Sequence, residues 1–199
     1  SPLVRTPTCF SPTLVPMTLL RHLRSLLLAP LLTAAALFAP YASAQLGAQK
    51  AVVTTDQART ELLAHAPEGV SPGQPVWVGL KIEHKKHWHT YWKNAGDSGL
   101  PTVLEWTLPA GVSAGELAWP IPKKISVGPL VNYGYEDTLL LAVPLTIGPD
   151  FKPPVLGNEL TVKLRASWLI CKTECIPEEG EYTLRIPLKG STALHSAAF

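Results

Sequence analysis

Residues 160–188 read LTVKLRASWLICKTECIPEEGEYTLRIPL, and this stretch decides the fold class. Apolar residues alternate on both sides of the central Cys-Lys-Thr-Glu-Cys segment, which is the period of a strand with one buried face. The stretch therefore predicts two strands joined by a short turn. The positions expected on the buried face are Leu160, Val162, Leu164, Ala166, Trp168 and Ile170 in the first strand and Tyr182, Leu184, Ile186 and Leu188 in the second.

The chain ahead of this stretch carries further short apolar runs, separated by segments rich in proline and glycine. Residues 76–82, 102–108 and 139–147 are the clearest of these runs. Pro144 interrupts the third run and predicts a bulge or an edge position there. Residues 55–65 form the one weak helix candidate and fit a first strand with its loop equally well. This spacing of runs and turns predicts an all-β antiparallel sandwich.

The amino-terminal residues have the pattern of an export signal. Met17 is the only methionine, and two arginines at positions 21 and 24 precede an apolar stretch over residues 25–38. The small residues at 42–44 (ASA) predict a cleavage site. A membrane anchor is the alternative, but the apolar stretch is short for a span of roughly 20 residues, and Pro30 interrupts it.

These patterns divide the chain into three parts. Residues 1–44 are expected to hold upstream residues and the signal peptide, residues 45–190 the folded domain, and residues 191–199 a linker or truncation point. After residue 44 the chain carries 14 Lys/Arg and 15 Asp/Glu, so the net charge is 14 − 15 = −1. No basic stripe stands out, and no nucleic-acid partner is expected.

Cys171 and Cys175 are the only cysteines after residue 44. In one straight strand they would lie ~13 Å apart, whereas a disulfide needs Cα atoms within roughly 7 Å. A bond therefore requires a sharp turn at residues 172–174. Three interpretations stay open: a structural disulfide, a metal site and a redox pair. Such a short loop gives a structural disulfide only ~2 kcal/mol of stabilisation, which favours the redox interpretation.

Two other motifs offer alternative sites. His87 and His89 would share one face of a strand and could hold copper or zinc, although two imidazoles and one thiol pair are few ligands. Residues 96–99 (GDSG) resemble the nucleophile segment of trypsin-like proteases, but no activating histidine accompanies them, and the same letters make a good turn.

Four motifs recur in one known family: residues 88–94 (WHTYWKN), 96–101 (GDSGLP), 132–136 (NYGYE) and 168–177 (WLICKTECIP). Together they resemble the amino-terminal periplasmic domain of the DsbD family of thiol:disulfide interchange proteins, and within it the suppressor-of-copper-sensitivity B branch. The resemblance implies an immunoglobulin-like sandwich with a redox-active pair at one end, and it implies no cofactor.

The resemblance also assigns roles to individual residues. Cys175 would form the mixed disulfide with a partner, and Cys171 would resolve it. Residues 132–136 would form a cap loop over the pair, with Asn132, Tyr133, Tyr135 and Glu136 as its members.

The expected function is a periplasmic protein-disulfide reductase relay. Its partners would be thioredoxin-like periplasmic proteins, as in cytochrome maturation or copper tolerance. Electrons would come from membrane-embedded and thioredoxin-like domains of the same protein, if these follow downstream. The alternative is a non-enzymatic exported binding module with a structural disulfide, which could bind copper through His87 and His89.

Overall fold

The structure is a computed structural model, and it describes residues 49–190 and 195–199 of the chain. In these residues strands joined by turns account for the regular structure, apart from one 3-10 turn at Ser196–Ala198, so the predicted all-β class is confirmed. The described residues belong to one compact unit, Gly47–Phe199. The predicted signal peptide, the residues before Met17 and residues 191–194 lie outside the described residues.

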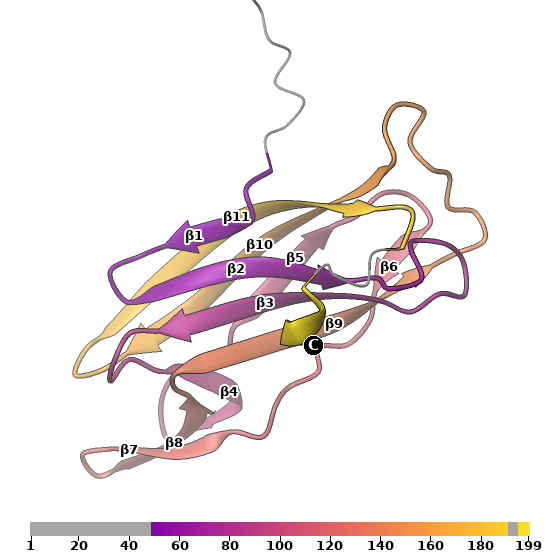
Figure 1. Ribbon diagram of the computed structural model, residues 1–199. Coiled ribbons are helices and arrows are strands. Elements are labelled where there is room, and N and C mark those ends of the chain that lie inside the picture. Colours follow the sequence, from indigo (N-terminus) through magenta and orange to yellow (C-terminus); the bar gives the residue numbers. More distant parts are fainter. Residues whose placement is uncertain (1–48, 191–194) are drawn as a thin grey trace, which may run out of the picture. The chain divides into compact units, whose positions relative to one another are not determined.

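The larger layer is a five-stranded antiparallel sheet with the order β1-β2-β3-β9-β6 (Figure 1). Alternating apolar residues and β-branched side chains suit the long central strands of this layer, because one of its faces is buried. The strands are β1 (Val52–Thr54), β2 (Ala58–His65), β3 (Val76–His84), β6 (Val112–Ala114) and β9 (Thr138–Ile147).

The facing layer is a three-stranded sheet with the order β11-β10-β5. Its strands are β5 (Val103–Thr107), β10 (Glu159–Cys171) and β11 (Cys175–Pro187). The last two form one hairpin whose register runs without a break from Glu159 opposite Pro187 to Cys171 opposite Cys175. The predicted strand–turn–strand of residues 160–188 is therefore confirmed.

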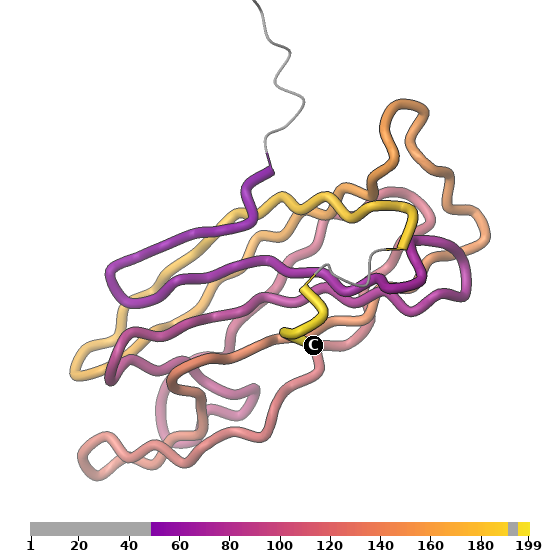
Figure 2. The backbone as a smooth tube through the Cα atoms, in the orientation of Figure 1, coloured from indigo at the N-terminus to yellow at the C-terminus, as the bar shows by residue number. Residues whose placement is uncertain are grey.

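A small third sheet with the order β4-β8-β7 lies beyond one end of the two layers. Its strands are β4 (Thr90–Gly96), β7 (Lys123–Val127) and β8 (Leu130–Tyr135). Figure 2 shows the tip of the β10–β11 hairpin beside the turn between β3 and β4 at this same end. The elements that meet at the cysteine pair therefore come from distant parts of the chain.

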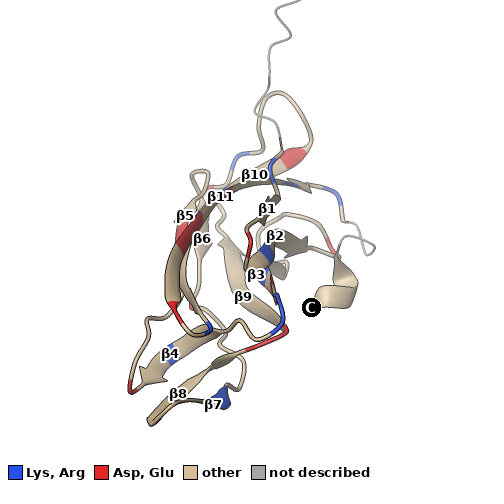
Figure 3. Cartoon of the chain, turned by 90° about the vertical axis from the view of Figure 1, so that its left-hand side faces the viewer, with Lys and Arg blue, Asp and Glu red and all other residues tan. Residues whose placement is uncertain are grey.

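The core lies between the two layers, which face each other in the end-on view of Figure 3. All the apolar positions predicted for the buried face of the hairpin are buried, except Leu188, which is partly buried and packs against the core. Charged residues of both signs are scattered over the outer faces in Figure 3. This arrangement of antiparallel layers is an immunoglobulin-like sandwich.

Two local expectations can be compared with the structure. Residues 55–65 form a loop followed by strand β2, so the strand alternative holds and the helix candidate is wrong. At Pro144 the register with β3 is unbroken, whereas on the other side the pairing with β6 ends at Leu145 and the next bridge joins Ala142 to Ala118, so the expected irregularity lies on the β6 side. Pro144 still contributes to the sheet, since its carbonyl accepts a hydrogen bond from the backbone N–H of Gly115.

Candidate redox site

The β10–β11 hairpin brings the two cysteines together. Cys171 is the last residue of β10 and Cys175 is the first of β11, and their Cα atoms lie 4.1 Å apart with the side chains joined in a disulfide. In the three-residue turn the N–H of Lys172 donates to the carbonyl of Glu174 at 3.0 Å. The sharp turn that a disulfide requires is therefore present.

The two cysteines differ in their access to solvent. Cys171 is buried, with 3% of its surface exposed, whereas Cys175 is exposed at the tip of the hairpin. A partner protein can therefore approach Cys175 directly, whereas Cys171 offers almost no exposed surface.

The start of β4 lies against the cysteine hairpin. His89 pairs with Cys171, because the N–H of each residue donates to the carbonyl of the other, at 3.0 and 2.9 Å. Residues that pair directly across strands project to the same side of a sheet. His89, Cys171 and Cys175 therefore form a row across three neighbouring strands.

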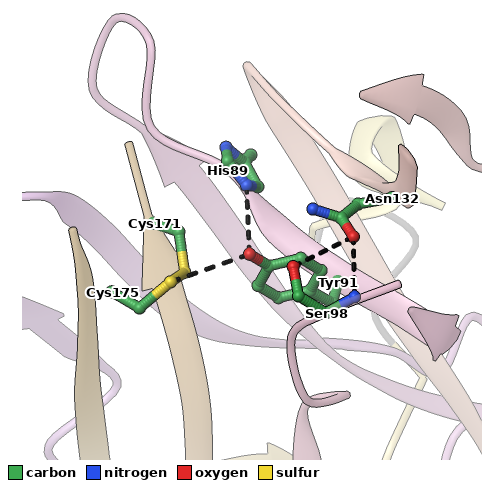
Figure 4. Close-up of a disulfide and its surroundings, with 6 residues drawn as sticks. All are labelled: His89, Tyr91, Ser98, Asn132, Cys171 and Cys175. Atoms are coloured by element: carbon green, nitrogen blue, oxygen red, sulfur yellow. Dashed lines mark hydrogen bonds between the residues drawn. A yellow bond between two sulfur atoms is a disulfide. The ribbon is translucent and has the colours of Figure 1, made fainter. Parts of the chain in front are cut away.

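Tyr91 follows two residues after His89 and closes over the disulfide. Its hydroxyl lies 3.8 Å from Sγ of Cys175 and 3.3 Å from Nε2 of His89 (Figure 4). The two rings meet edge to face, with centroids 5.2 Å apart. Burial raises the pKa of Tyr91, against the effect of a hydrogen bond with Ser98, so this phenol is neutral at physiological pH.

Burial also sets the state of the imidazole. It lowers the pKa of His89, and the carboxylate of Glu136 opposes this effect. A neutral imidazole carries one N–H. His89 can therefore donate to the tyrosine oxygen while the tyrosine hydroxyl donates to sulfur.

The GDSG segment holds Tyr91 in place as a turn, and no serine-nucleophile arrangement forms there. The N–H and Oγ of Ser98 both donate to Oδ1 of Asn132, at 2.9 and 3.1 Å, and Asp97 accepts from the N–H of Val131 at 2.8 Å. Gly99 packs against the ring of Tyr91 so closely that a Cβ at this position would overlap ring carbons. The turn therefore fixes the tyrosine that contacts the disulfide.

The residues predicted for a cap loop lie in β8 and just after it, on the side of β4 away from the cysteines. Asn132 is fully buried, and Tyr135 is buried with its hydroxyl donating to the carbonyl of Pro120 at 2.8 Å. Tyr133 is 40% exposed, and Glu136 is half-buried. The contact to Cys175 comes from Tyr91, so a covering role for Tyr133 and Tyr135 stays a prediction.

The expected common face of His87 and His89 does not form. His87 lies in the exposed turn before β4 with a φ of 73°, whereas His89 is buried beside Cys171. Across residues 49–190 and 195–199, no group of three or more His, Cys, Asp or Glu side chains could hold a metal ion. A copper role for His87 and His89 stays a prediction.

A comparison with protein families matches residues 59–187 to the family described as "Thiol:disulfide interchange protein DsbD, N-terminal". The match covers more than half of the chain. The chain belongs to this family. The resemblance inferred from the sequence is thus confirmed, and the disulfide of this DsbD N-terminal domain supports a role in thiol–disulfide exchange.

One solved structure shows a similar fold. The N-terminal periplasmic domain of ScsB from Proteus mirabilis matches this DsbD N-terminal domain with a TM-score of 0.51 and 22% identity. The match covers 73% of this chain and 54% of that chain, so the chain spans about half the length of the ScsB domain. The N-terminal domain of Neisseria meningitidis DsbD, in the reduced form, matches with a TM-score of 0.37 and 14% identity over 63% of this chain and 87% of that one. No curated protein matches the chain.

The sequence patterns give Tyr91 no part in the site. Tyr91 is buried, at 2% exposure, and it lies 84 residues from Cys175 in the sequence. The available signal was the alternation in residues 88–92, which puts His89 and Tyr91 on one face. The pairing of His89 with Cys171 depends on sheet topology, and no local pattern contains it.

Proposed function

We propose that this domain passes reducing equivalents through Cys171 and Cys175 to thioredoxin-like partners in the periplasm. The observation that carries the proposal is the asymmetry of the pair: one cysteine is exposed at a hairpin tip, and the other is buried behind it. In a two-step exchange, the accessible thiolate attacks the partner and the hidden one displaces it. Cys175 is therefore the attacking and Cys171 the resolving residue.

The surface beside Cys175 supports docking of a protein partner. An apolar groove borders the hairpin, and in it Leu100 is 65% and Val103 49% exposed. Apolar surface of this kind beside a reactive group is typical of an interaction site. The apolar residues that line the groove are Leu100, Pro101, Val103, Trp168, Leu169 and Pro177.

Electrons for the pair would come from membrane-embedded and thioredoxin-like domains, as the family resemblance implies. Within the described part of the chain, no helix is both long and apolar enough to cross a membrane. The periplasmic location rests on the export signal predicted at the amino terminus and on family membership. Residues 132–136 remain the proposed cap, with Tyr133 as its exposed aromatic residue.

The test is to trap the intermediate. Reduced Cys171→Ala protein is mixed with an oxidised thioredoxin-like protein, and the products are separated without reductant. A mixed disulfide through Cys175 is expected, because the residue that would release the partner is absent. Cys175→Ala is the matched control and should trap nothing at this site.

If Cys171→Ala traps no partner, the assigned roles are wrong. The reduction potential separates the relay from the alternative of a structural disulfide in a binding module. A structural disulfide should sit below about −300 mV, whereas a relay exchanges with glutathione buffers at less negative values.

A further inference from the structure

The contact between Tyr91 and Cys175 has a chemical role beyond packing. We propose that Tyr91 is a catalytic residue whose phenol hydroxyl, oriented by His89, donates a hydrogen bond to Sγ of Cys175 and stabilises its thiolate. The inference rests on the proposed function, because it concerns the same exchange reaction. Two contacts carry it: 3.8 Å from the hydroxyl to Sγ and 3.3 Å from the hydroxyl to Nε2 of His89.

The direction of the two hydrogen bonds follows from the atoms present. A sulfur in a disulfide has no proton, so Tyr91 must be the donor to Cys175. The phenol has one proton, so its oxygen must accept from the N–H at Nε2 of His89. His89 therefore donates to Tyr91, and Tyr91 donates to Sγ of Cys175, the sulfur that a partner can approach.

The surroundings favour a strong effect on a negative charge. His89 and Tyr91 are 3% and 2% exposed, so water does not compete for either group. Hydrogen bonds to charged groups are about twice as strong as neutral ones. The contact therefore gains strength when Cys175 becomes a thiolate and loses it when the disulfide forms.

Other titratable groups near the site do not replace this donor. Lys172 and Glu174 lie in the exposed hairpin turn and carry opposite charges. Glu178 already accepts from Nε1 of Trp168 at 2.9 Å and from Oγ1 of Thr55 at 3.1 Å. Glu136 interacts with His89, and His89 in turn with His84 on β3.

The step balances as an ordinary exchange. The Cys175 thiol gives its proton to solvent, and the thiolate attacks one sulfur of the partner disulfide, whose S–S bond breaks and leaves a partner thiolate. The Cys171 thiol then gives its proton to the first partner thiolate, and the Cys171 thiolate attacks Sγ of Cys175, breaks the mixed disulfide and releases the second partner thiolate. Two electrons pass from the pair to the partner, and Tyr91 stabilises the thiolate that starts the sequence.

The test measures Cys175 without any partner protein. In a reduced Cys171→Ala background, the rate of iodoacetamide alkylation is followed against pH, and the peptide that contains Cys175 is quantified by mass spectrometry. Tyr91→Phe should raise the midpoint of this pH profile by about one pH unit, since the substitution removes one hydrogen bond to the Cys175 thiolate. At pH 7 the rate should fall about three- to fourfold, because the tenfold loss of thiolate is partly offset by higher nucleophilicity.

Tyr182→Phe is the matched control. It removes a buried tyrosine hydroxyl from the same strand as Cys175, where that hydroxyl bonds Oγ1 of Thr60 at 2.6 Å, seven residues from the site. Its alkylation midpoint should equal that of the parent. An unchanged midpoint in Tyr91→Phe, or an equal shift in Tyr182→Phe, would overturn the catalytic role.

His89 acts as a positioning residue and is tested through Tyr91. His89→Leu should raise the midpoint by part of the Tyr91→Phe shift, and His89→Gln, which keeps an N–H donor, should restore it. The double variant His89→Leu/Tyr91→Phe should shift no further than Tyr91→Phe alone. Additive shifts would show that His89 acts independently and would overturn this assignment. Because no partner takes part, these results stand apart from the trapping test of the proposed function.

Discussion

Gly99→Ala should destabilise the domain through one identifiable overlap. Gly99 has a φ of 97°, and a Cβ there would overlap three ring carbons of Tyr91. The backbone conformation alone costs a residue with a side chain about 1–2 kcal/mol. Forcing an extra methyl group into a packed site adds about 1–3 kcal/mol. The expected loss of unfolding free energy is therefore about 2–5 kcal/mol.

Gly73→Ala separates the two contributions. Gly73 has a φ of 82°, but a Cβ there would meet no atom within 4 Å. Gly73→Ala should therefore lose only the unfolding free energy that the backbone conformation costs, about 1–2 kcal/mol. The assay is urea unfolding, where a slope of about 2 kcal/mol/M turns a difference of 1–3 kcal/mol into roughly 0.5–1.5 M between the two midpoints.

A third variant identifies the atoms responsible. Tyr91→Ala removes the ring, so adding Gly99→Ala in that background should cost no more than Gly73→Ala does. Equal losses for Gly99→Ala and Gly73→Ala in the native background would refute the claim that Gly99 is required by the tyrosine.

Three further outcomes are expected. Burial lowers the pKa of both His84 and His89 below the ordinary 6.5, so below that pH the unfolded chain binds more protons than the folded one. The midpoint of urea unfolding should therefore fall as the pH drops below about 6.5. A midpoint that stays constant from pH 7.5 to 5 would contradict the burial of these rings. Reduction of the Cys171–Cys175 bond should cost about 2 kcal/mol of unfolding free energy, the value for a five-residue loop, and a much larger loss in dithiothreitol would indicate that the bond is mainly structural. Val103→Asp places a charge in the apolar groove, so it should slow reduction of a thioredoxin-like partner at least fivefold. The rate of Cys175 alkylation, which needs no partner, should stay unchanged. Equal effects on both rates would mean that the groove is not the docking surface.

The hairpin was predictable because its information is local. Period-two alternation over residues 160–170 fixes which face is buried, and the turn requirement for Cys171 and Cys175 follows from chain geometry alone. The family was predictable from four short motifs whose combination is specific. Neither prediction depends on which strands pair across the sandwich.

Other features could not be read from local patterns. Thr55 accepts hydrogen bonds from the N–H groups of Gln57 and Ala58, as a helix N-cap does, yet the chain continues as strand β2 because that strand pairs with β3. Propensity is a weak guide where tertiary pairing decides. The contact of Tyr91 with Cys175 could not be predicted from local sequence either, because it forms only when the start of β4 lies beside the end of β10.

The position of the cysteine hairpin in the chain has a consequence for biogenesis. Strand β10 is the middle strand of its layer, and β5 has no other partner in that layer, so the layer cannot assemble until residues 159–187 are available. Synthesis delivers the amino-terminal part first. If the protein is exported as proposed, β1 to β9 leave the translocation pore before the segment that completes the domain, and the two thiols reach the oxidants outside only with that segment.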